Sequence, residues 1–245
     1  MKMKKVILVG LMVLCWCMPA LALDVVSVRS VSLYYPKGYE TQAAALKSEV
    51  PAMLDFLQAK GLRVKRPLHV SLDPDRDLPE VGVYLYPHRG LRLPLREPGV
   101  MEEGGSEPDP RRYFLFKGLC LEAIYSLRGG LIEGGYRVFG EIVATNNIMP
   151  PWVGDGVAAL LWREYSGSSA VQPLDRAVYA SGLAPDFARI NNHPESWPGY
   201  FGYRIYGRPF VEWLNAAYGW EALLEFLRLH GRGLVFFEVD SKARK

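Results

Sequence analysis

The sequence predicts an α+β fold, in which a small mixed or antiparallel sheet with one helix precedes a mainly helical half. Short β-branched segments with alternating polarity lie before residue 100, whereas segments with helical spacing of apolar residues follow residue 110. The stretch between them is rich in glycine, proline and acidic residues, which is typical of a loop. Of the 245 residues, 49% are hydrophobic, so one globular domain is expected over residues 23–245.

The first half predicts a sheet and one helix. Strands are expected at 25–34, 68–72, 81–86 and 91–95. The last two of these are expected to pair with each other. Residues 41–60 have helical spacing, and Pro51 is expected to kink this helix or to divide it in two.

The second half predicts a loop followed by helices. Residues 97–110 form the expected loop, and residues 111–127 are apolar on most sides, as in a buried helix. Further helices are expected at 152–165, 199–218 and 220–230. The pairs Gly129-Gly130 and Gly134-Gly135 are interpreted as turn glycines.

The N-terminus has the pattern of a secretory signal peptide. Lys2, Lys4 and Lys5 precede an apolar run over 6–18, and Ala20-Leu21-Ala22 fits the small-x-small cleavage pattern. The apolar run is shorter than the roughly 20 residues that span a bilayer. We therefore expect cleavage after Ala22 and a periplasmic or secreted protein without a stable membrane anchor. A signal that is retained as an anchor is the alternative.

Removal of this segment changes the charge and the cysteine content. Its three lysines account for the net charge of +3, so the remaining chain is balanced and predicts neither a nucleic-acid nor an anionic-membrane partner. Cys15 and Cys17 lie in the segment, which leaves Cys120 alone and excludes an internal disulfide. Because Cys120 lies on an apolar helix, it is interpreted as an inert core thiol.

Residues 150–158 read PPWVGDGVA. This segment resembles the Pro-x-Trp-x-x-Glu-Gly-x-Ala signature of the gluzincin-like "peptidase MA-like" family of zinc metallopeptidases. In that family the glutamate is the third zinc ligand, on a helix downstream of a His-Glu-x-x-His helix. Asp155 stands at that ligand position here.

The resemblance extends through a series of spaced motifs over about residues 35–229. Upstream, the His-Glu-x-x-His frame and the two glycine motifs that follow it correspond to 117–121, Gly129-Gly130 and Phe139-Gly140. Downstream, similar positions are Trp197-Pro198-Gly199, 203–210 and Tyr218-Gly219. The family implies a zincin-like helical half.

The residues at the family's metal positions cannot form its zinc site. His-Glu-x-x-His works because positions i and i+4 share one helix face, so that two imidazoles reach one ion and the glutamate activates its water. Lys117 and Leu121 replace the two histidines, and Gly118 replaces the general base. Neither an ammonium nor a leucine side chain offers a lone pair. A shifted register over 121–125 keeps a glutamate but still lacks both histidines.

We therefore expect no catalytic residue, no bound metal and no cofactor. Lys117 and Asp155 are instead predicted to form an ion pair in the emptied site, because a buried charge needs a partner. Leu121 would fill the volume of a lost histidine, and Gly118 would leave room for the lysine stem. The alternative is that Lys117 reaches solvent from the edge of the helix.

Few other residues suggest a site. The four histidines (His69, His88, His193 and His230) are too far apart in sequence to predict a metal site. Four aromatic residues are candidates for lining a cleft: Trp152, Tyr200, Tyr203 and Tyr206. A packing stripe is the alternative for the tyrosines.

These observations predict an exported, catalytically inactive metallopeptidase-like protein that binds an extended peptide or a partner protein. One alternative is an active hydrolase with Asp155 and either Glu122 or Glu164 as acid and base. Another is a structural subunit of an envelope assembly.

Overall fold

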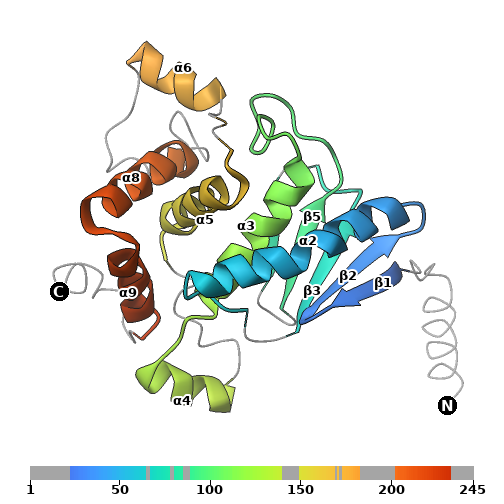
Figure 1. Cartoon of the computed structure of the whole chain (residues 1–245), viewed down its shortest axis with the longest axis horizontal. Helices are drawn as coiled ribbons and strands as arrows, with labels where there is room; N and C mark the ends of the chain where they lie inside the picture. Colours follow the sequence, from blue (N-terminus) through green and yellow to red (C-terminus); the bar gives the residue numbers. More distant parts are fainter. Residues whose placement is uncertain are drawn as a thin grey trace, which may run out of the picture.

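The computed structural model has the predicted α+β fold, with a five-stranded mixed sheet near the N-terminus and a helical half after it (Figure 1). It describes residues 23–64, 67–77, 80–84, 89–139, 149–168, 170, 173–182 and 202–232. Within these residues no helix is both long enough and apolar enough to cross a membrane.

The sheet has the strand order β1-β2-β3-β5-β4. Its strands are β1 (Leu23–Val28), β2 (Val31–Pro36), β3 (Leu68–Asp73), β4 (Gly82–Tyr84) and β5 (Gly90–Pro94). The central pairs β2–β3 and β3–β5 are parallel, whereas β1 and β4 run antiparallel at the two edges. The predicted pairing of the last two strands is confirmed, with Val83 opposite Leu91.

The single strand predicted at 25–34 is wrong, because the chain reverses within it. Val28 pairs with Val31 across a tight turn, and Arg29 adopts a φ of 51° there. Alternating polarity continues through both arms of such a hairpin, and neither glycine nor proline marks the turn. The pattern alone therefore did not separate β1 from β2.

One face of the sheet carries the core. In β3 the buried side chains Leu68, Val70 and Leu72 alternate with His69 and Ser71, which are exposed or partly exposed. Helix α2 (Glu40–Ala59) packs against β1 and β2, and α3 (Pro110–Tyr125) packs against β5 and β4. Pro51 lies inside α2, so the helix is not divided there.

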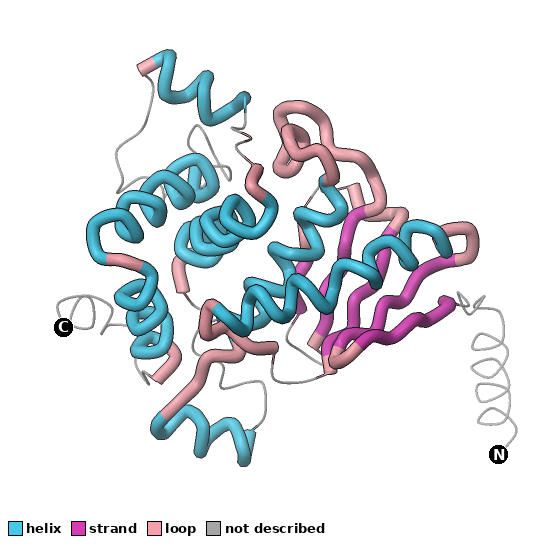
Figure 2. Tube along the Cα trace, in the orientation of Figure 1, coloured by secondary structure: helices cyan, strands magenta, loops and turns pink. Residues whose placement is uncertain are grey.

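The helical half adds further layers beside α3. Its other helices are α4 (Gly130–Phe139), α5 (Pro151–Ser166), α6 (Pro173–Ser181), α8 (Gly202–Tyr218) and α9 (Trp220–His230). In succession, α3 packs on α5, α5 on α8 and α8 on α9 (Figure 1). The predicted loop is confirmed: residues 95–109 contain no helix or strand and connect β5 to α3 (Figure 2).

Helices α4 and α6 were not predicted, and Gly134-Gly135 lies inside α4 rather than in a turn. Each glycine in a helix costs about 1 kcal/mol relative to alanine. Ile132 and Tyr136, four residues apart, are both buried, and this apolar pair offsets that cost.

Glycines bring α5 and α8 close together. A Cβ on Gly156 would lie 2.5 Å from the carbonyl oxygen of Gly207, and a Cβ on Gly207 would lie 2.5 Å from that of Trp152. Since atoms cannot approach so closely, both positions require glycine for this crossing. The crossing places Asp155 of α5 close to Arg204 in the first turn of α8.

Candidate functional site

The candidate site is built around a lysine in the buried middle of α3. Pro110 occupies the first turn of this helix, and the Asp109 carboxylate caps it by accepting the Arg112 amide at 3.1 Å. Every residue from Tyr113 to Ile124 is buried, and the Lys117 side chain is only 3% exposed. The alternative that Lys117 reaches solvent is therefore excluded.

Lys117 lies between two carboxylates. Its Nζ is 2.5 Å from Asp155 Oδ1 and 2.5 Å from Glu103 Oε1. The predicted pair with Asp155 is confirmed, and it joins α3 to α5. Glu103 was not predicted, because it comes from the loop before α3, where no periodicity indicates which acidic residue turns inward.

Two further residues complete the cluster around Glu103. The Tyr113 hydroxyl donates to Glu103 Oε1 at 2.8 Å, and Arg204 Nη2 lies 3.3 Å from Oε2. Arg204 also donates to Glu80, the second residue before β4. We call Lys117, Glu103, Asp155, Arg204 and Tyr113 the lysine cluster. It connects the loop, α3, α5 and α8, and Arg204 links it to Glu80 before β4.

Burial and charge act in opposite directions in the lysine cluster. Burial favours a neutral Glu103, but the attraction of Lys117 and Arg204 prevails and lowers its pKa. Burial, with repulsion from Glu103, raises the pKa of Asp155 in spite of Lys117. Burial favours a neutral Lys117, but Asp155 and Glu103 together raise its pKa. The lysine is thus held in its charged form.

The other two positions that the resemblance aligns with a metal site, 118 and 121, make apolar contacts. Leu121 Cδ2 lies 2.9 Å from where a Cβ on Gly154 would stand, so the leucine packs closely on α5 at the residue before Asp155. The prediction for Gly118 needs correction. Its missing side chain admits Leu91 and Val81, which would lie 2.7 and 3.0 Å from a Cβ, so α3 approaches the sheet closely there.

The donor set does not fit the zinc ion that the family resemblance implies. Zinc needs lone pairs from imidazole, thiolate or carboxylate groups. Here an ammonium occupies the centre and takes up both nearby carboxylates. In the described part of the chain, no group of three or more His, Cys, Asp and Glu residues could hold a metal ion.

The acid–base alternative finds no support in the geometry. Glu122 is buried in an ion pair with Arg89, which also donates to Ser126 Oγ at 2.7 Å. Glu164 pairs with Lys60 near the surface. Each carboxylate is therefore engaged with a cation other than Lys117.

Two of the four residues predicted to line a cleft, Trp152 and Tyr206, pack against other aromatic rings. Trp152 packs edge-on against Phe210 at 5.2 Å between ring centroids, and Tyr206 packs against Tyr179 at 6.3 Å. Tyr200 lies outside the described residues, and the side chain of Tyr203 is not described. Their role in lining a cleft stays a prediction.

Cys120, His69 and His230 lie in surroundings that are typical of structural residues. Cys120 is fully buried, and burial raises the pKa of its thiol, which keeps it unreactive. His69 contacts the Tyr34 hydroxyl at 3.0 Å on the exposed face of the sheet, and His230 is buried at the end of α9. His88 and His193 lie outside the described residues.

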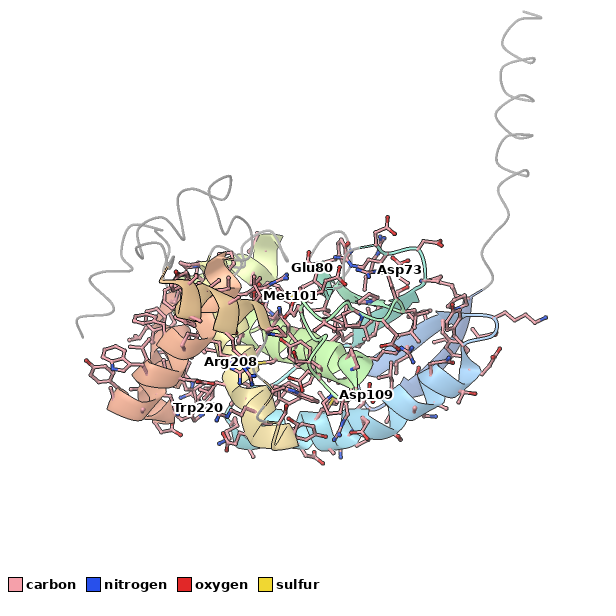
Figure 3. The ribbon with its side chains drawn as sticks, turned by 90° about the horizontal axis from the view of Figure 1, so that it is seen from above. Asp73, Glu80, Met101, Asp109, Arg208 and Trp220 are labelled. Atoms are coloured by element: carbon pink, nitrogen blue, oxygen red, sulfur yellow. The ribbon has the colours of Figure 1, made fainter. Side chains whose placement is uncertain are left out.

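A half-open pocket of about 60 Å³ adjoins the lysine cluster. Three members of its lining, Glu103, Asp155 and Arg204, belong to the cluster. The other lining residues come from the loop, α5, α6 and α8: Met101, Ala159, Leu174, Asp175, Ile205 and Arg208. In Figure 3, Met101 and Glu80 lie between the sheet side and the helical side of the molecule, and Arg208 lies on the helical side.

No protein-family model and no curated protein matches the chain. The resemblance to the peptidase MA-like family therefore rests on the spaced motifs.

Proposed function

We propose that the chain is an exported, catalytically inactive relative of gluzincin-like metallopeptidases that binds an extended peptide. The observation that carries this proposal is the position of Lys117, whose ammonium occupies the point at which the family's two helices would converge on a metal. A cation supplied by the chain itself replaces the ion. The cluster then preserves the packing of α3 on α5 without the chemistry.

The β4 edge of the sheet supplies the binding surface in this proposal. Strand β4 stands at the end of the strand order, and among the described residues its only strand partner is β5. An unpaired edge presents backbone N–H and C=O groups to which an extended peptide can add as a further strand. The pocket lies close by, because Arg204 links its lining to Glu80 before β4.

The mature protein should not retain stoichiometric zinc. Lys117, Gly118 and Leu121 remove both imidazoles and the general base, and Lys117 repels a cation. Elemental analysis after exposure to zinc and desalting should find far less than one zinc per chain. About one tightly held zinc per chain would contradict the proposal.

Extended peptides should bind at β4 through their backbone. We expect a capped octapeptide of alternating threonine and valine, without lysine, to shift the NMR signals of Gly82, Val83 and Tyr84. The same peptide with N-methyl groups on alternate residues cannot donate the ladder hydrogen bonds and should not bind. Equal binding of both peptides, or no shift at β4, would count against this surface.

Export should remove residues 1–22. The lysines, apolar run and Ala20-Leu21-Ala22 motif predict signal-peptidase cleavage. Mass spectrometry of the extracytoplasmic fraction should find an N-terminus at Leu23, which is also the first residue of β1. Recovery of the uncleaved chain in the cytoplasm would refute this prediction.

A further inference from the structure

The pocket beside the lysine cluster has an apolar wall and a charged end. Met101, Leu174, Ala159 and Ile205 supply carbon atoms from four different elements. Its volume of about 60 Å³ is several times what one water molecule needs, so it admits a short unbranched side chain. The wall therefore suits the methylene groups of a ligand. The charged residues of the lining determine which functional group that ligand can have at its end.

The two arginines of the lining are already paired with carboxylates of the protein. Arg204 donates to Glu80 and lies 3.3 Å from Glu103. Arg208 donates to Glu212 at 3.1 Å and to the carbonyl oxygen of Ala170 at 3.0 Å. An anionic ligand would have to compete with these carboxylates for both arginines.

Two carboxylates of the lining can accept further hydrogen bonds. The Asp175 carboxylate forms no hydrogen bond and no ion pair with any residue that the structure describes, although burial raises its pKa to about 6 against the opposing effect of Arg208. Glu103 Oε2 is buried and accepts no hydrogen bond within the described chain; Arg204 is its ion-pair contact. Both can accept hydrogen bonds from a ligand.

We infer that this pocket binds the ammonium group of a lysine side chain, with Asp175 as its main acceptor and the apolar wall around its methylene stem. Lysine fits because it presents three N–H donors at the end of a flexible apolar chain. The inference rests on the proposed peptide binding, and it assigns the peptide a preferred side chain. A peptide paired with β4 would present that side chain next to the pocket, since Glu80 and Arg204 join the two.

The test uses two blocked amino acids, N-acetyl-lysine N-methylamide and N-acetyl-norleucine N-methylamide, titrated into the mature protein by NMR. Both have a similar stem, but only lysine is charged. We expect saturable binding of the lysine compound, and binding of the norleucine compound at least about tenfold weaker. Equal affinities, no saturable binding, or a preference for N-acetyl-glutamate N-methylamide would overturn the inference.

Three variants assign the site. Asp175→Asn should lower the affinity for the lysine compound at least about tenfold, whereas Asp24→Asn, a matched change on β1, should leave it unchanged. Ala159→Phe should block the pocket while keeping Asp175. This variant therefore still tests the site if Asp175→Asn fails to fold. Unchanged lysine binding in Asp175→Asn and in Ala159→Phe would place the ligand elsewhere.

The octapeptide described above contains no lysine, so the two proposals fail separately. If the octapeptide binds at β4 but the lysine and norleucine compounds bind equally, only the inference about the pocket is rejected. Lysine binding at Asp175 without octapeptide binding rejects the β4 surface and with it the proposed function.

Discussion

Replacing Lys117 with methionine should destabilise the protein by about 3–5 kcal/mol, because the change strands the largely buried Asp155 carboxylate and takes one of its cations from Glu103. Methionine keeps the length of the stem but not the charge. Asp155 and Glu103, whose side chains are 14% and 8% exposed, would lose the ammonium that lies 2.5 Å from each. Chemical denaturation at pH 7 measures the free energy of unfolding. Lys37→Met, at an exposed position, should change it by less than about 0.5 kcal/mol.

Double variants separate loss of the pair from loss of packing. Lys117→Met with Asp155→Leu should recover much of the stability, since Glu103 then still has Arg204 and Tyr113 as partners. The free energy of unfolding of the double variant should therefore exceed that of Lys117→Met alone. Single and double changes that are both near neutral would mean that the pair contributes nothing.

The stabilisation by Lys117 should also depend on pH in the alkaline range. Its pKa is raised above the ordinary value of 10.5 by Asp155 and Glu103 against the effect of burial. A raised lysine pKa contributes stability that is fully present below 10.5 and is lost as the pH rises through the folded-state value. The difference in unfolding free energy between wild type and Lys117→Met should therefore shrink above pH 10.5. A constant difference would argue against a charged Lys117.

The sequence could predict those parts of the fold and site that have a fixed spacing. Position 117 and position 155 lie on long helices that the sequence predicts, so a frame of motifs was enough to place Lys117 beside Asp155. Glu103 could not be found in this way, because its inward direction depends on the path of a loop with no repeating pattern. Asp175 was missed for a related reason, since α6 is short and preceded by residues without helical spacing.

The corrections follow from packing between segments that are distant in sequence. Gly118 was expected to make room for its neighbour in sequence, but the space is taken by Leu91 and Val81 from the sheet region. Likewise, Gly134 and Gly135 suggested a turn by local propensity, whereas the buried pair Ile132 and Tyr136 holds that segment in a helix. Local signals cannot show which surface a helix will pack against.

A second buried ion pair, between Glu122 of α3 and Arg89 just before β5, should be as sensitive as the first. Arg89 and Glu122 have side chains that are 5% and 2% exposed, and Arg89 also donates to Ser126 at 2.7 Å. Arg89→Met should cost about 3–5 kcal/mol, because it removes the cation that pairs with the buried Glu122 carboxylate. Chemical denaturation measures this cost, and Arg63→Met at an exposed position serves as the matched control, expected within about 0.5 kcal/mol of wild type.

The double change Arg89→Met with Glu122→Met removes both charges and replaces them with flexible apolar side chains. It should be clearly more stable than Arg89→Met, because an apolar pair in that position carries no desolvation penalty. The two ion pairs should behave additively, since Arg89 contacts Glu122 and Ser126 whereas Lys117 contacts Glu103 and Asp155, with no shared partner among these contacts. If Arg89→Met is near neutral while Lys117→Met is not, burial of a charge on α3 does not by itself set the cost. The two carboxylates around Lys117 would then be the decisive difference between the sites.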